Sequence, residues 1–289
     1  MKVLVTGGAG FVGKNLSNKL VEIDKYEVSV IDDLSNGSWE DLNYKVKRIE
    51  STVSDWLDTS QAESSYFDII YHLGEYARVE QSFEEPTKVI DSNSVGTAKL
   101  LKYCLEKKSK LVYAGSSTKF AKDLVGKESS PYALTKALNT EIIKIFGDWY
   151  DLNYAICYFY NVYGPGEQRV GKYATFIGLC EYHYLNKTTL TLTSPGNQER
   201  NFTHIGDIVN GLILVGENGS GDNYGIGHPD AYSVRKVGEL FNLPTVIGPE
   251  KRGNRLAANV MNNKIESLGW IPKYSLPEYI ADFIEKNSK

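Results

Sequence analysis

The first half of the chain alternates short apolar runs with longer amphipathic stretches. The runs are rich in Val, Ile, Leu and Tyr and are apolar on both faces, which is typical of strands buried between layers of helices. Several of the intervening stretches repeat apolar residues at the helical period, so the alternation predicts βαβ units and a parallel sheet. The expected strands are 2–6, 27–31, 46–49, 69–73, 110–114 and 154–158, and the clearest expected helices are 13–21, 88–105 and 132–150.

The second half has a different texture. Turn signals become denser after Gly164-Pro165-Gly166, and the helical stretches become shorter. There is no internal repeat and no low-complexity segment. We therefore expect an α/β unit over residues 1–165, completed by part of 200–230, and a smaller region interleaved with it over 166–289.

Composition narrows the class of protein. The chain has 289 residues, 42% of them hydrophobic and 24% charged, with a formal net charge of −4. These values are typical of a globular protein with a substantial core, and without a basic patch they predict no nucleic-acid partner. No apolar run is long enough for a membrane span, and the first run is too short for a signal peptide.

The three cysteines are far apart in sequence and odd in number. Cys104, Cys157 and Cys180 form no CxxC pair and no Cys/His spacing, so they indicate neither a disulfide framework nor a metal site. All three lie in apolar stretches and are expected to be small buried hydrophobic residues. A reducing compartment follows, and we expect the protein to be cytoplasmic.

A glycine loop joins the first expected strand to the first expected helix. Gly7, Gly10 and Gly13 form a GxxGxxG pattern at the place where such a pattern has physical meaning. The first glycines allow a tight turn and close approach to a pyrophosphate, the last allows close helix–strand packing, and the helix N-terminus offers free N–H groups. The loop predicts a dinucleotide site in a Rossmann-type fold.

An acidic pair follows the second strand and selects the dinucleotide. Asp32 and Asp33 stand about twenty residues beyond the loop, where an acid accepts hydrogen bonds from the adenosine ribose. A carboxylate at that place also repels a 2′-phosphate, which favours NAD over NADP. An acidic turn without a ligand is the alternative explanation.

A YxxxK pair and a serine supply candidate redox chemistry. Tyr132 and Lys136 are four residues apart at the start of an expected helix and therefore share one face. Ser116 ends the strand 110–114, at the sheet edge where ligands bind. A phenol is a poor base at neutral pH, but a cation about 4 Å away brings its pKa from about 10 toward 7. A serine hydroxyl can hold the substrate oxygen while a hydride moves.

With these motifs in order, the sequence resembles the extended short-chain dehydrogenase/reductases, and in particular their NAD-dependent nucleotide-sugar epimerases and dehydratases. The resemblance covers nearly the whole chain. It rests on 6–13, 68–73, 93–97, the Ser/Tyr/Lys set, 159–165, 198–207, 224–227 and 264–272. It implies an α/β fold, a Rossmann-type doubly wound parallel sheet with a smaller, interleaved C-terminal substrate-binding region.

The resemblance also implies roles for individual residues. Tyr132 is the catalytic base or acid, Lys136 binds the nicotinamide ribose, and Ser116 is the catalytic Ser/Thr. The implied cofactor contacts are Gly7, Gly10, Phe11, Val12, Gly13, Asp32, Asp33, Thr52, Val53, Leu73, Gly74, Tyr76, Asn93, Tyr132, Lys136 and Tyr160. The implied substrate contacts, mainly to the diphosphate, are Ser116, Asn161, Arg200, Lys251, Arg252 and Arg255. From the residues alone, Asn93 could equally cap a turn and Arg200 could be a surface cation.

Two positions depart from the family pattern. The adenine contact is usually an Asp, and Thr52 stands in its place, with Asp55 as a possible substitute. Glu75 is unusual beside the cofactor, and a carboxylate near the nicotinamide would favour its oxidised, positively charged form.

The residues after Ser116 bear on the reaction. In the family, dehydratases place an Asp-Glu pair after the catalytic Thr and decarboxylases carry a nearby Glu, whereas Ser117-Thr118-Lys119 contains no acid. This favours a nucleotide-sugar 4-epimerase that works by reversible hydride transfer at C4 through a 4-keto intermediate. The alternatives are a C4 dehydrogenase or reductase, a 4,6-dehydratase, a decarboxylase, or a non-catalytic NAD-binding regulator. The family usually dimerises through the YxxxK helix, so we expect a homodimer.

Overall fold

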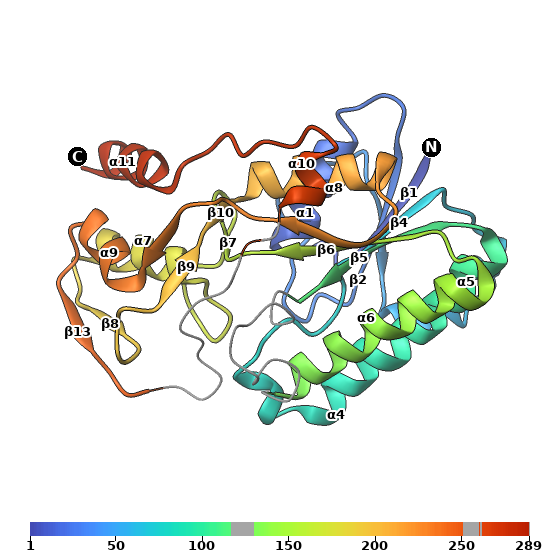
Figure 1. Ribbon diagram of the computed structural model, residues 1–289, viewed down its shortest axis with the longest axis horizontal. Coiled ribbons are helices and arrows are strands. Elements are labelled where there is room, and N and C mark those ends of the chain that lie inside the picture. Colours follow the sequence, from blue (N-terminus) through green and yellow to red (C-terminus); the bar gives the residue numbers. More distant parts are fainter. Residues whose placement is uncertain (117–129, 251–259, 261, 289) are drawn as a thin grey trace.

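The computed structural model describes residues 1–116, 130–250, 260 and 262–288. Its long axis carries two lobes side by side (Figure 1). The larger lobe contains a central sheet with helices on both faces, and the smaller lobe is built from short strands and helices of the second half. The N-terminus lies at the sheet, whereas the C-terminal helix lies on the smaller lobe.

The central sheet has seven strands, and every strand pair in it is parallel. Its order is β11-β6-β5-β4-β1-β2-β3, so the chain moves outward in both directions from β1. This is the doubly wound order, in which the crevice beside the first strand is the usual ligand site. The strands are β1 Lys2–Thr6, β2 Glu27–Asp32, β3 Lys47–Glu50, β4 Ile69–His72, β5 Lys110–Gly115, β6 Tyr154–Phe159 and β11 Gly221–Ile226.

Helices cover both faces of this sheet because its strands are apolar on both sides. Val3 and Val5 of β1 enter one core cluster and Leu4 enters the other, as expected for a strand with a period of two. The first face is covered by α1 Phe11–Leu20, α8 Ile205–Asn218 and α10 Asn263–Glu266. The second face is covered by α2 Val53–Leu57, α3 Ser60–Ser64, α5 Gly96–Lys107 and α6 Pro131–Tyr150.

Three short helical segments lead into α5 along the second face. They are η1 Gln81–Phe83, α4 Pro86–Val89 and the π-helix η2 Ile90–Val95. The expected single helix over 88–105 is therefore a composite of α4, η2 and α5. A π-turn carries an extra residue, which turns the side chains within it to a different direction from that in a regular helix.

The smaller lobe has its own apolar core, which includes Tyr163, Cys180, Phe202 and Phe241. Its strands pair two by two: β7 with β10, β9 with β12, and β8 with β13. Its elements are β7 Val162–Tyr163, α7 Phe176–Asn186, β8 Leu190–Leu192, β9 Glu199–Asn201, β10 Thr203–His204, β12 Ala231–Ser233, α9 Val234–Leu240, β13 Thr245–Ile247 and α11 Leu276–Asn287.

The expected α/β class and all six expected strands are confirmed, with ends shifted by at most one residue. The expectation that the run 46–49 is buried on both faces was wrong, because β3 is an edge strand that is mostly exposed. All three cysteines are buried and free, as expected. No helix in the described part of the chain is both long and apolar enough to cross a membrane.

Candidate active site

The glycine loop forms a cradle that side chains would fill. Gly7 has φ +67°, and a Cβ there would stand 2.6 Å from the Cα of Gly74, so β1 and the loop after β4 approach each other backbone to backbone. A Cβ on Gly13 would stand 2.2 Å from the Gly7 carbonyl oxygen. Gly10, the N-cap of α1, supplies no side-chain hydrogen bond, and no acid stands in the first turn. The N–H groups of that turn, which includes Phe11 and Val12, therefore suit a pyrophosphate.

Asp32 ends β2 beside this cradle and is 8% exposed. Its carboxylate accepts hydrogen bonds from the Ala9 N–H at 2.9 Å and the Leu34 N–H at 2.8 Å. Burial raises the pKa of Asp32 above its usual value, although these two hydrogen bonds oppose the rise. The carboxylate thus fixes the loop and still has lone pairs for a ribose. Asp33 is exposed and hydrogen-bonds Ser35.

The catalytic candidates meet at the carboxyl ends of β4 and β5. Ser116 directly follows β5 and is buried. Tyr132 lies in the first turn of α6, which Ser130 caps by accepting the Ala133 N–H at 3.1 Å, with Pro131 at the first helical position. Lys136 lies one turn further and is 5% exposed. It donates to the carbonyl oxygen of Ala114, two residues before Ser116, and so ties α6 to β5.

Lys136 also forms a buried ion pair with Glu75, an acid in the loop after β4. The lysine Nζ lies 4.4 Å from the ring centre of Tyr113. The sequence led us to expect a lysine whose charge is free to act on the tyrosine. The structure shows instead a lysine whose charge is balanced by a carboxylate.

A polar network satisfies the rest of Glu75. Its Oε1 accepts hydrogen bonds from Thr97 at 2.8 Å, Asn139 at 2.8 Å and Tyr113 at 3.2 Å. Burial is the largest single influence on Glu75 and raises its pKa, but the positive charge of Lys136 and the hydrogen bonds to the carboxylate together outweigh it and leave the pKa below its usual range. The carboxylate is therefore charged at neutral pH despite its complete burial.

His72 supports this network without carrying charge. Its ring nitrogens lie 2.8 Å from the Thr6 hydroxyl and 3.0 Å from the Thr97 hydroxyl. Burial lowers the pKa of His72 to about 4, so the ring is neutral at pH 7. This agrees with its expected structural role.

Asn93 holds the loop after β4 against α6. It is fully buried in η2, and its side-chain oxygen accepts the Tyr76 N–H at 2.7 Å while its nitrogen donates to the Thr135 hydroxyl at 3.0 Å. Leu73 and Gly74 precede this anchor and line the approach to Gly7. Asn93 thus positions the cleft wall through Tyr76, because its own polar atoms are engaged by protein groups.

Three further expected cofactor contacts have separate structural tasks. Thr52 follows β3 and caps α2, accepting the Asp55 N–H at 3.0 Å, and Val53 is buried at the start of that helix. Tyr160 is 1% exposed and belongs to the core of the second sheet face. The ring of Tyr160 packs in the core, and its implied cofactor contact stays a prediction.

The expected substrate residues gather where the smaller lobe meets the sheet. Asn161 has φ +37°, and its side chain donates to the Asn201 carbonyl at 2.9 Å, next to Arg200 on β9. The Arg200 guanidinium hydrogen-bonds the Glu199 carbonyl at 2.8 Å. The other three expected cations, Lys251, Arg252 and Arg255, lie outside the described residues.

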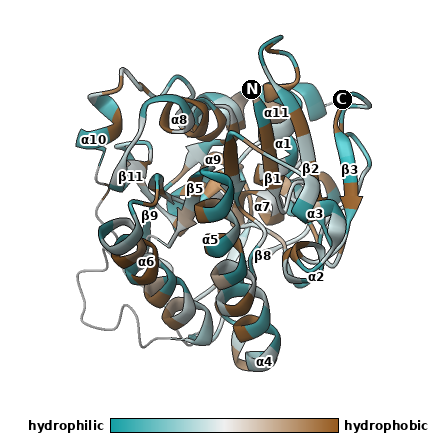
Figure 2. Cartoon of the chain, turned by 90° about the vertical axis from the view of Figure 1, so that its right-hand side faces the viewer, coloured by the Kyte–Doolittle hydropathy of each residue, from teal (hydrophilic) through white to brown (hydrophobic). Residues whose placement is uncertain are grey.

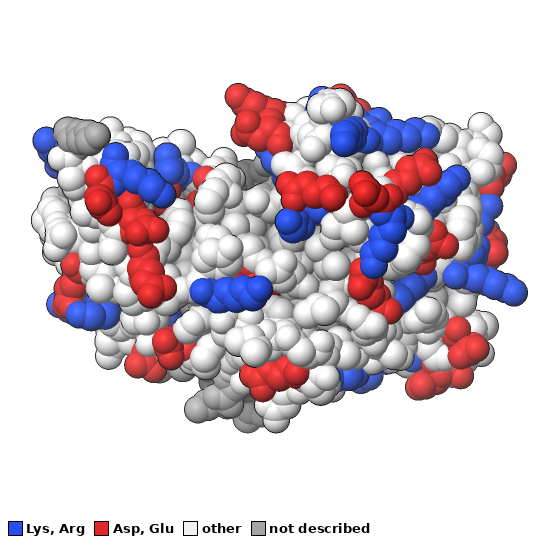
Figure 3. All heavy atoms as spheres, turned by 90° about the horizontal axis from the view of Figure 1, so that it is seen from above, with Lys and Arg blue, Asp and Glu red and all other residues white. Residues whose placement is uncertain are grey.

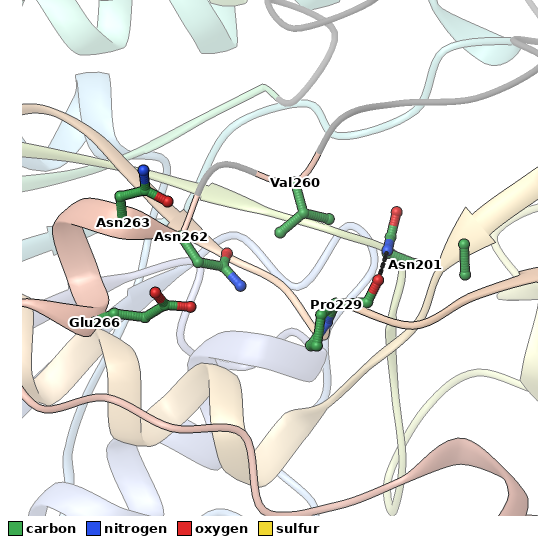
Figure 4. Close-up of a pocket in the computed structure, with 7 residues that line it drawn as sticks. Asn201, Pro229, Val260, Asn262, Asn263 and Glu266 are labelled. Carbon is green, nitrogen blue, oxygen red and sulfur yellow. Dashed lines mark hydrogen bonds between the residues drawn. The ribbon is translucent and has the colours of Figure 1, made fainter.

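A pocket of about 370 Å³ adjoins this group. Figure 4 shows Asn201 beside Pro229 on one side and Asn262, Asn263 and Glu266 on the other. Asn201 donates to the Pro229 carbonyl at 3.0 Å. Asn201 lines this pocket and accepts the hydrogen bond from Asn161, so the pocket lies next to the expected substrate residues. Charges of both signs are interspersed over the face shown in Figure 3.

Sequence reasoning missed one pairing and one residue of the cleft. The pairing of Glu75 with Lys136 requires two elements 61 residues apart to meet, and the only available signal was an acid at an unusual position. Arg78 was not singled out, yet it lies next to Tyr173 of the smaller lobe. Among the described residues, no group of three His, Cys, Asp or Glu side chains is arranged to hold a metal ion.

The sequence profile of the NAD dependent epimerase/dehydratase family matches residues 3–227. The chain belongs to this family. It is therefore an enzyme with NAD as cofactor, and the glycine cradle, the Asp32 carboxylate and the Tyr132/Lys136 pair described above fit that cofactor. Its expected family membership is confirmed.

Individual relatives point to nucleotide-sugar chemistry. A putative UDP-glucose 4-epimerase of Methanocaldococcus jannaschii is 28% identical, over 96% of this chain and 95% of that protein. The UDP-glucuronic acid decarboxylase 3 of Arabidopsis thaliana is 27% identical, over 96% of this chain and 86% of that protein. The crystal structure of a Thermotoga maritima UDP-glucose 4-epimerase with UDP-glucose has the same fold, with a TM-score of 0.91, 24% identity and complete coverage of both chains. Other relatives are dehydratases, so the family leaves the specific reaction open.

Proposed function

We propose that the protein is an NAD-dependent nucleotide-sugar 4-epimerase. The observation that carries the proposal is the arrangement of Ser116, Tyr132 and Lys136 around the end of β5, with no acid among the three residues after Ser116. Names of relatives support a UDP-sugar as substrate, because a 4-epimerase and a decarboxylase of UDP-sugars both align with almost the whole chain.

Each residue of the site has a separate role in the proposed epimerisation. The glycine loop and Asp32 would hold NAD, which would supply the acceptor and donor of the hydride at C4 of the sugar. Tyr132 takes the proton of the C4 hydroxyl as that hydride leaves and gives a proton back when the ketone is reduced. Ser116 holds the sugar oxygen, and Lys136 orients the ribose. Asn161 and Arg200 bind the diphosphate, so the sugar can turn while its nucleotide stays fixed.

The absence of an acid beside Ser116 distinguishes this proposal from its competitors. Elimination of water needs a further acid or base, whereas epimerisation needs only reversible hydride transfer. The second candidate is a C4 dehydrogenase or reductase, which uses the same three residues but releases the keto sugar. A non-catalytic NAD-binding protein would have no reason to keep both Tyr132 and Lys136.

Product analysis tests the proposal. The purified protein, first analysed by mass spectrometry for released NAD, is incubated without added cofactor with UDP-, GDP-, CDP- and dTDP-hexoses. We expect at least one hexose to reach an equilibrium mixture of 4-epimers. Accumulation of NADH with a keto sugar would favour the second candidate. The Tyr132→Phe variant should lose about 100-fold or more of the rate and keep its bound NAD, as expected when a general acid–base is removed.

We also propose a homodimer formed through α6. Large apolar side chains project from its outer face, where Leu134, Leu138, Ile142, Ile145 and Trp149 are 37% to 69% exposed. Figure 2 shows the apolar positions along this helix. An apolar face of this size on a monomer is unusual and marks an interface. Light scattering of Leu138→Glu should show monomers where the parent protein is dimeric, and a monomeric parent would contradict the proposal.

The remaining assignments stay proposals of the same kind. We infer a cytoplasmic location from the three free, buried cysteines. We also infer a dinucleotide-binding domain over 1–165 and a mainly substrate-binding region over 166–289. The strand β11 lies in the central sheet, which supports the return of part of 200–230 to the first domain.

A further inference from the structure

Glu75 is an almost completely buried carboxylate. A buried carboxylate is costly unless it is paired and hydrogen-bonded. Here four side chains from three elements converge on it: Thr97 from α5, Tyr113 from β5, and Asn139 and Lys136 from α6. A buried carboxylate is stable only when all of these partners are in place. One of the partners is Lys136, the lysine of the proposed reaction.

The ammonium group of Lys136 has one hydrogen-bond donor left for a ligand. An ammonium group has three donors. Lys136 gives one to Glu75 and one to the Ala114 carbonyl oxygen, on the side of the sheet core. The third donor is left for the cofactor ribose, and its direction is set by the other two.

We propose that Glu75 is a positioning residue, which aims Lys136 at the cofactor and balances its charge. The inference rests on the proposed function only in taking the cofactor ribose as the group that Lys136 binds. The consequence is electrostatic: with Glu75 ionised, the pair is neutral, so the positively charged oxidised nicotinamide meets no net repulsion from it. Loss of the carboxylate leaves one uncompensated positive charge and disfavours NAD⁺ relative to NADH.

Cofactor binding tests this without any sugar. The ratio of the Kd for NAD⁺ to the Kd for NADH is measured by titration for the parent enzyme stripped of cofactor, for Glu75→Gln and for Glu84→Gln. We expect Glu75→Gln to raise the ratio on the order of tenfold, as a unit charge about 10 Å away gives at an effective dielectric of 20. Glu84 is an exposed acid paired with Lys172, so its variant should not change the ratio.

An unchanged ratio in Glu75→Gln would overturn the proposal, whatever happens to turnover. If that variant does not fold, Glu75→Asp keeps the charge but shortens the reach. It should preserve the ratio and lower kcat by about tenfold or more, and a parental kcat would contradict the positioning role. Because the ratio is read without a sugar, it is independent of whether the protein is an epimerase.

A second observation concerns Arg78, a partly buried cation that forms no ion pair with an acid in the part of the chain that the structure describes. Its Nη2 donates to the Tyr173 carbonyl oxygen, and its guanidinium lies 5.6 Å from the Tyr173 ring centre. No carboxylate of the described residues lies within ion-pair distance of it. Burial lowers the pKa of Arg78, so its charge is poorly solvated. A cation in such surroundings usually serves an anion.

The position of Arg78 narrows the choice of anion. It lies two residues after Tyr76, which Asn93 holds against the first turns of α6, the helix that carries Tyr132. The cradle for the cofactor phosphates lies at β1 and α1, and the candidate diphosphate residues lie on β9 and before β7. The anion that remains near the reacting carbon is one carried by the sugar.

We infer that Arg78 binds the carboxylate of a nucleotide-diphosphate uronic acid. This inference deepens the proposed function and depends on it for the substrate's orientation. A planar guanidinium suits a carboxylate because it can donate two parallel hydrogen bonds. A hydroxymethyl group at the same carbon would leave the cation without its partner.

Paired substrates test this inference. The values of kcat/KM for UDP-glucose and UDP-glucuronic acid are compared in the parent enzyme, in Arg78→Met and in Arg235→Met, an exposed arginine on α9. We expect the parent to prefer the uronic acid at least tenfold, Arg78→Met to lose about 100-fold on the uronic acid and less than threefold on UDP-glucose, and Arg235→Met to match the parent. A parent that uses UDP-glucose and rejects the uronic acid would overturn the inference, and so would an equal loss on both substrates in Arg78→Met.

The Arg78 carboxylate site and the 4-epimerase activity can be contradicted independently of each other. If neither sugar reacts, calorimetric binding of UDP-glucuronic acid to the holoenzyme decides on Arg78: binding that is lost in Arg78→Met supports the carboxylate site, and binding that is retained overturns it. If the uronic acid instead releases carbon dioxide in an Arg78-dependent reaction, the epimerase proposal is wrong while the carboxylate site stands.

Discussion

Two buried glutamates, one in each half of the molecule, have opposite electrostatic surroundings. Glu75 in the sheet lobe faces the Lys136 ammonium, and its pKa is lowered overall although burial acts to raise it. Glu167 in the smaller lobe accepts hydrogen bonds from the Gly164 N–H at 3.0 Å and from the Thr175 hydroxyl. Burial raises the pKa of Glu167 to about 7.

The difference shows how one residue type serves two purposes. The fold places the Lys136 ammonium beside Glu75, because the proposed reaction needs a positive charge at that end of the cleft. Around Glu167 it supplies only dipoles, which hold a turn that follows β7 against α7. We therefore assign the charged network of the sheet lobe to the proposed chemistry and the network around Glu167 to packing.

The largest expected effect comes from breaking the charged pair. Lys136→Met leaves Glu75 buried without a partner, and removal of one member of a buried pair costs about 3–5 kcal/mol. Denaturant unfolding should show this loss at pH 7. Lys144→Met, which removes an exposed pair with Glu141 on the same helix, should cost at most about 1 kcal/mol. Equal effects of the two variants would mean that Glu75 does not depend on the lysine.

The neutral glutamate predicts a pH-dependent effect of intermediate size. Below about pH 4.5 the Glu167 carboxyl is protonated in both the folded and the unfolded chain, and between about 4.5 and 7 it ionises only in the unfolded chain. The free energy of unfolding therefore falls across this window, by about 3 kcal/mol for a pKa difference of about 2.5. Above pH 7 the penalty is constant.

Glu167→Gln should remove that slope. Its stability relative to the parent should rise between about pH 4.5 and 7 and stay higher at pH 8, as measured by urea unfolding at a series of pH values. A parent and variant with parallel pH profiles would show that Glu167 ionises normally and that the contrast with Glu75 does not exist.

The ribose carboxylate is expected to give a smaller change, in cofactor affinity. Asp32→Ala removes the acceptor for the Ala9 and Leu34 N–H groups together with the ribose contact. We expect NAD to bind about tenfold more weakly, since one lost hydrogen bond to a charged group is worth about 1.5 kcal/mol or more. Fluorescence titration would measure this, with Asp33→Ala as the control on the exposed neighbour. An equal loss in both variants would contradict the assignment.

The smallest effect concerns the adenine side of the site. Thr52→Ala should cost about 1 kcal/mol in stability, because the hydroxyl caps α2. Thr175→Ala, which removes the corresponding cap of α7 and a contact to Glu167, is the matched substitution in the other lobe. Since the Thr52 hydroxyl is already engaged, we expect NAD affinity to change less than threefold, and a larger change would make Thr52 a direct adenine contact.

Much of the sheet lobe could be predicted from sequence, because its information is local. Apolar runs identified all six expected strands, and the glycine loop and Asp32, which the sequence assigned to one site, lie together in the structure. The seventh strand β11 was missed because Gly221–Ile226 contains Gly, Asp and Asn and has no apolar run. The π-helix was missed because a single extra residue in a turn leaves the apolar period of α4 and α5 almost unchanged.

The rest of the site depends on contacts between distant segments. Glu75 and Lys136 are each visible in the sequence, but their pairing is not, and Arg78 gains its place only when the loop after β4 meets the smaller lobe. Tyr160 was assigned to the cofactor from its place next to a motif, and the packing of its ring in the core could not be read from that motif. Motifs identified the candidate residues, and packing determined what surrounds them.

The most direct test of the central claim follows one hydrogen atom. The holoenzyme is incubated, without added NAD, with a UDP-hexose or UDP-uronic acid that carries deuterium at C4, and the product is examined by NMR. Reversible transfer at C4 predicts a 4-epimer that retains the deuterium at C4, with no deuterium in free NADH. Deuterium released to NADH or to solvent, or a product with unchanged configuration at C4, would contradict the assignment as a 4-epimerase.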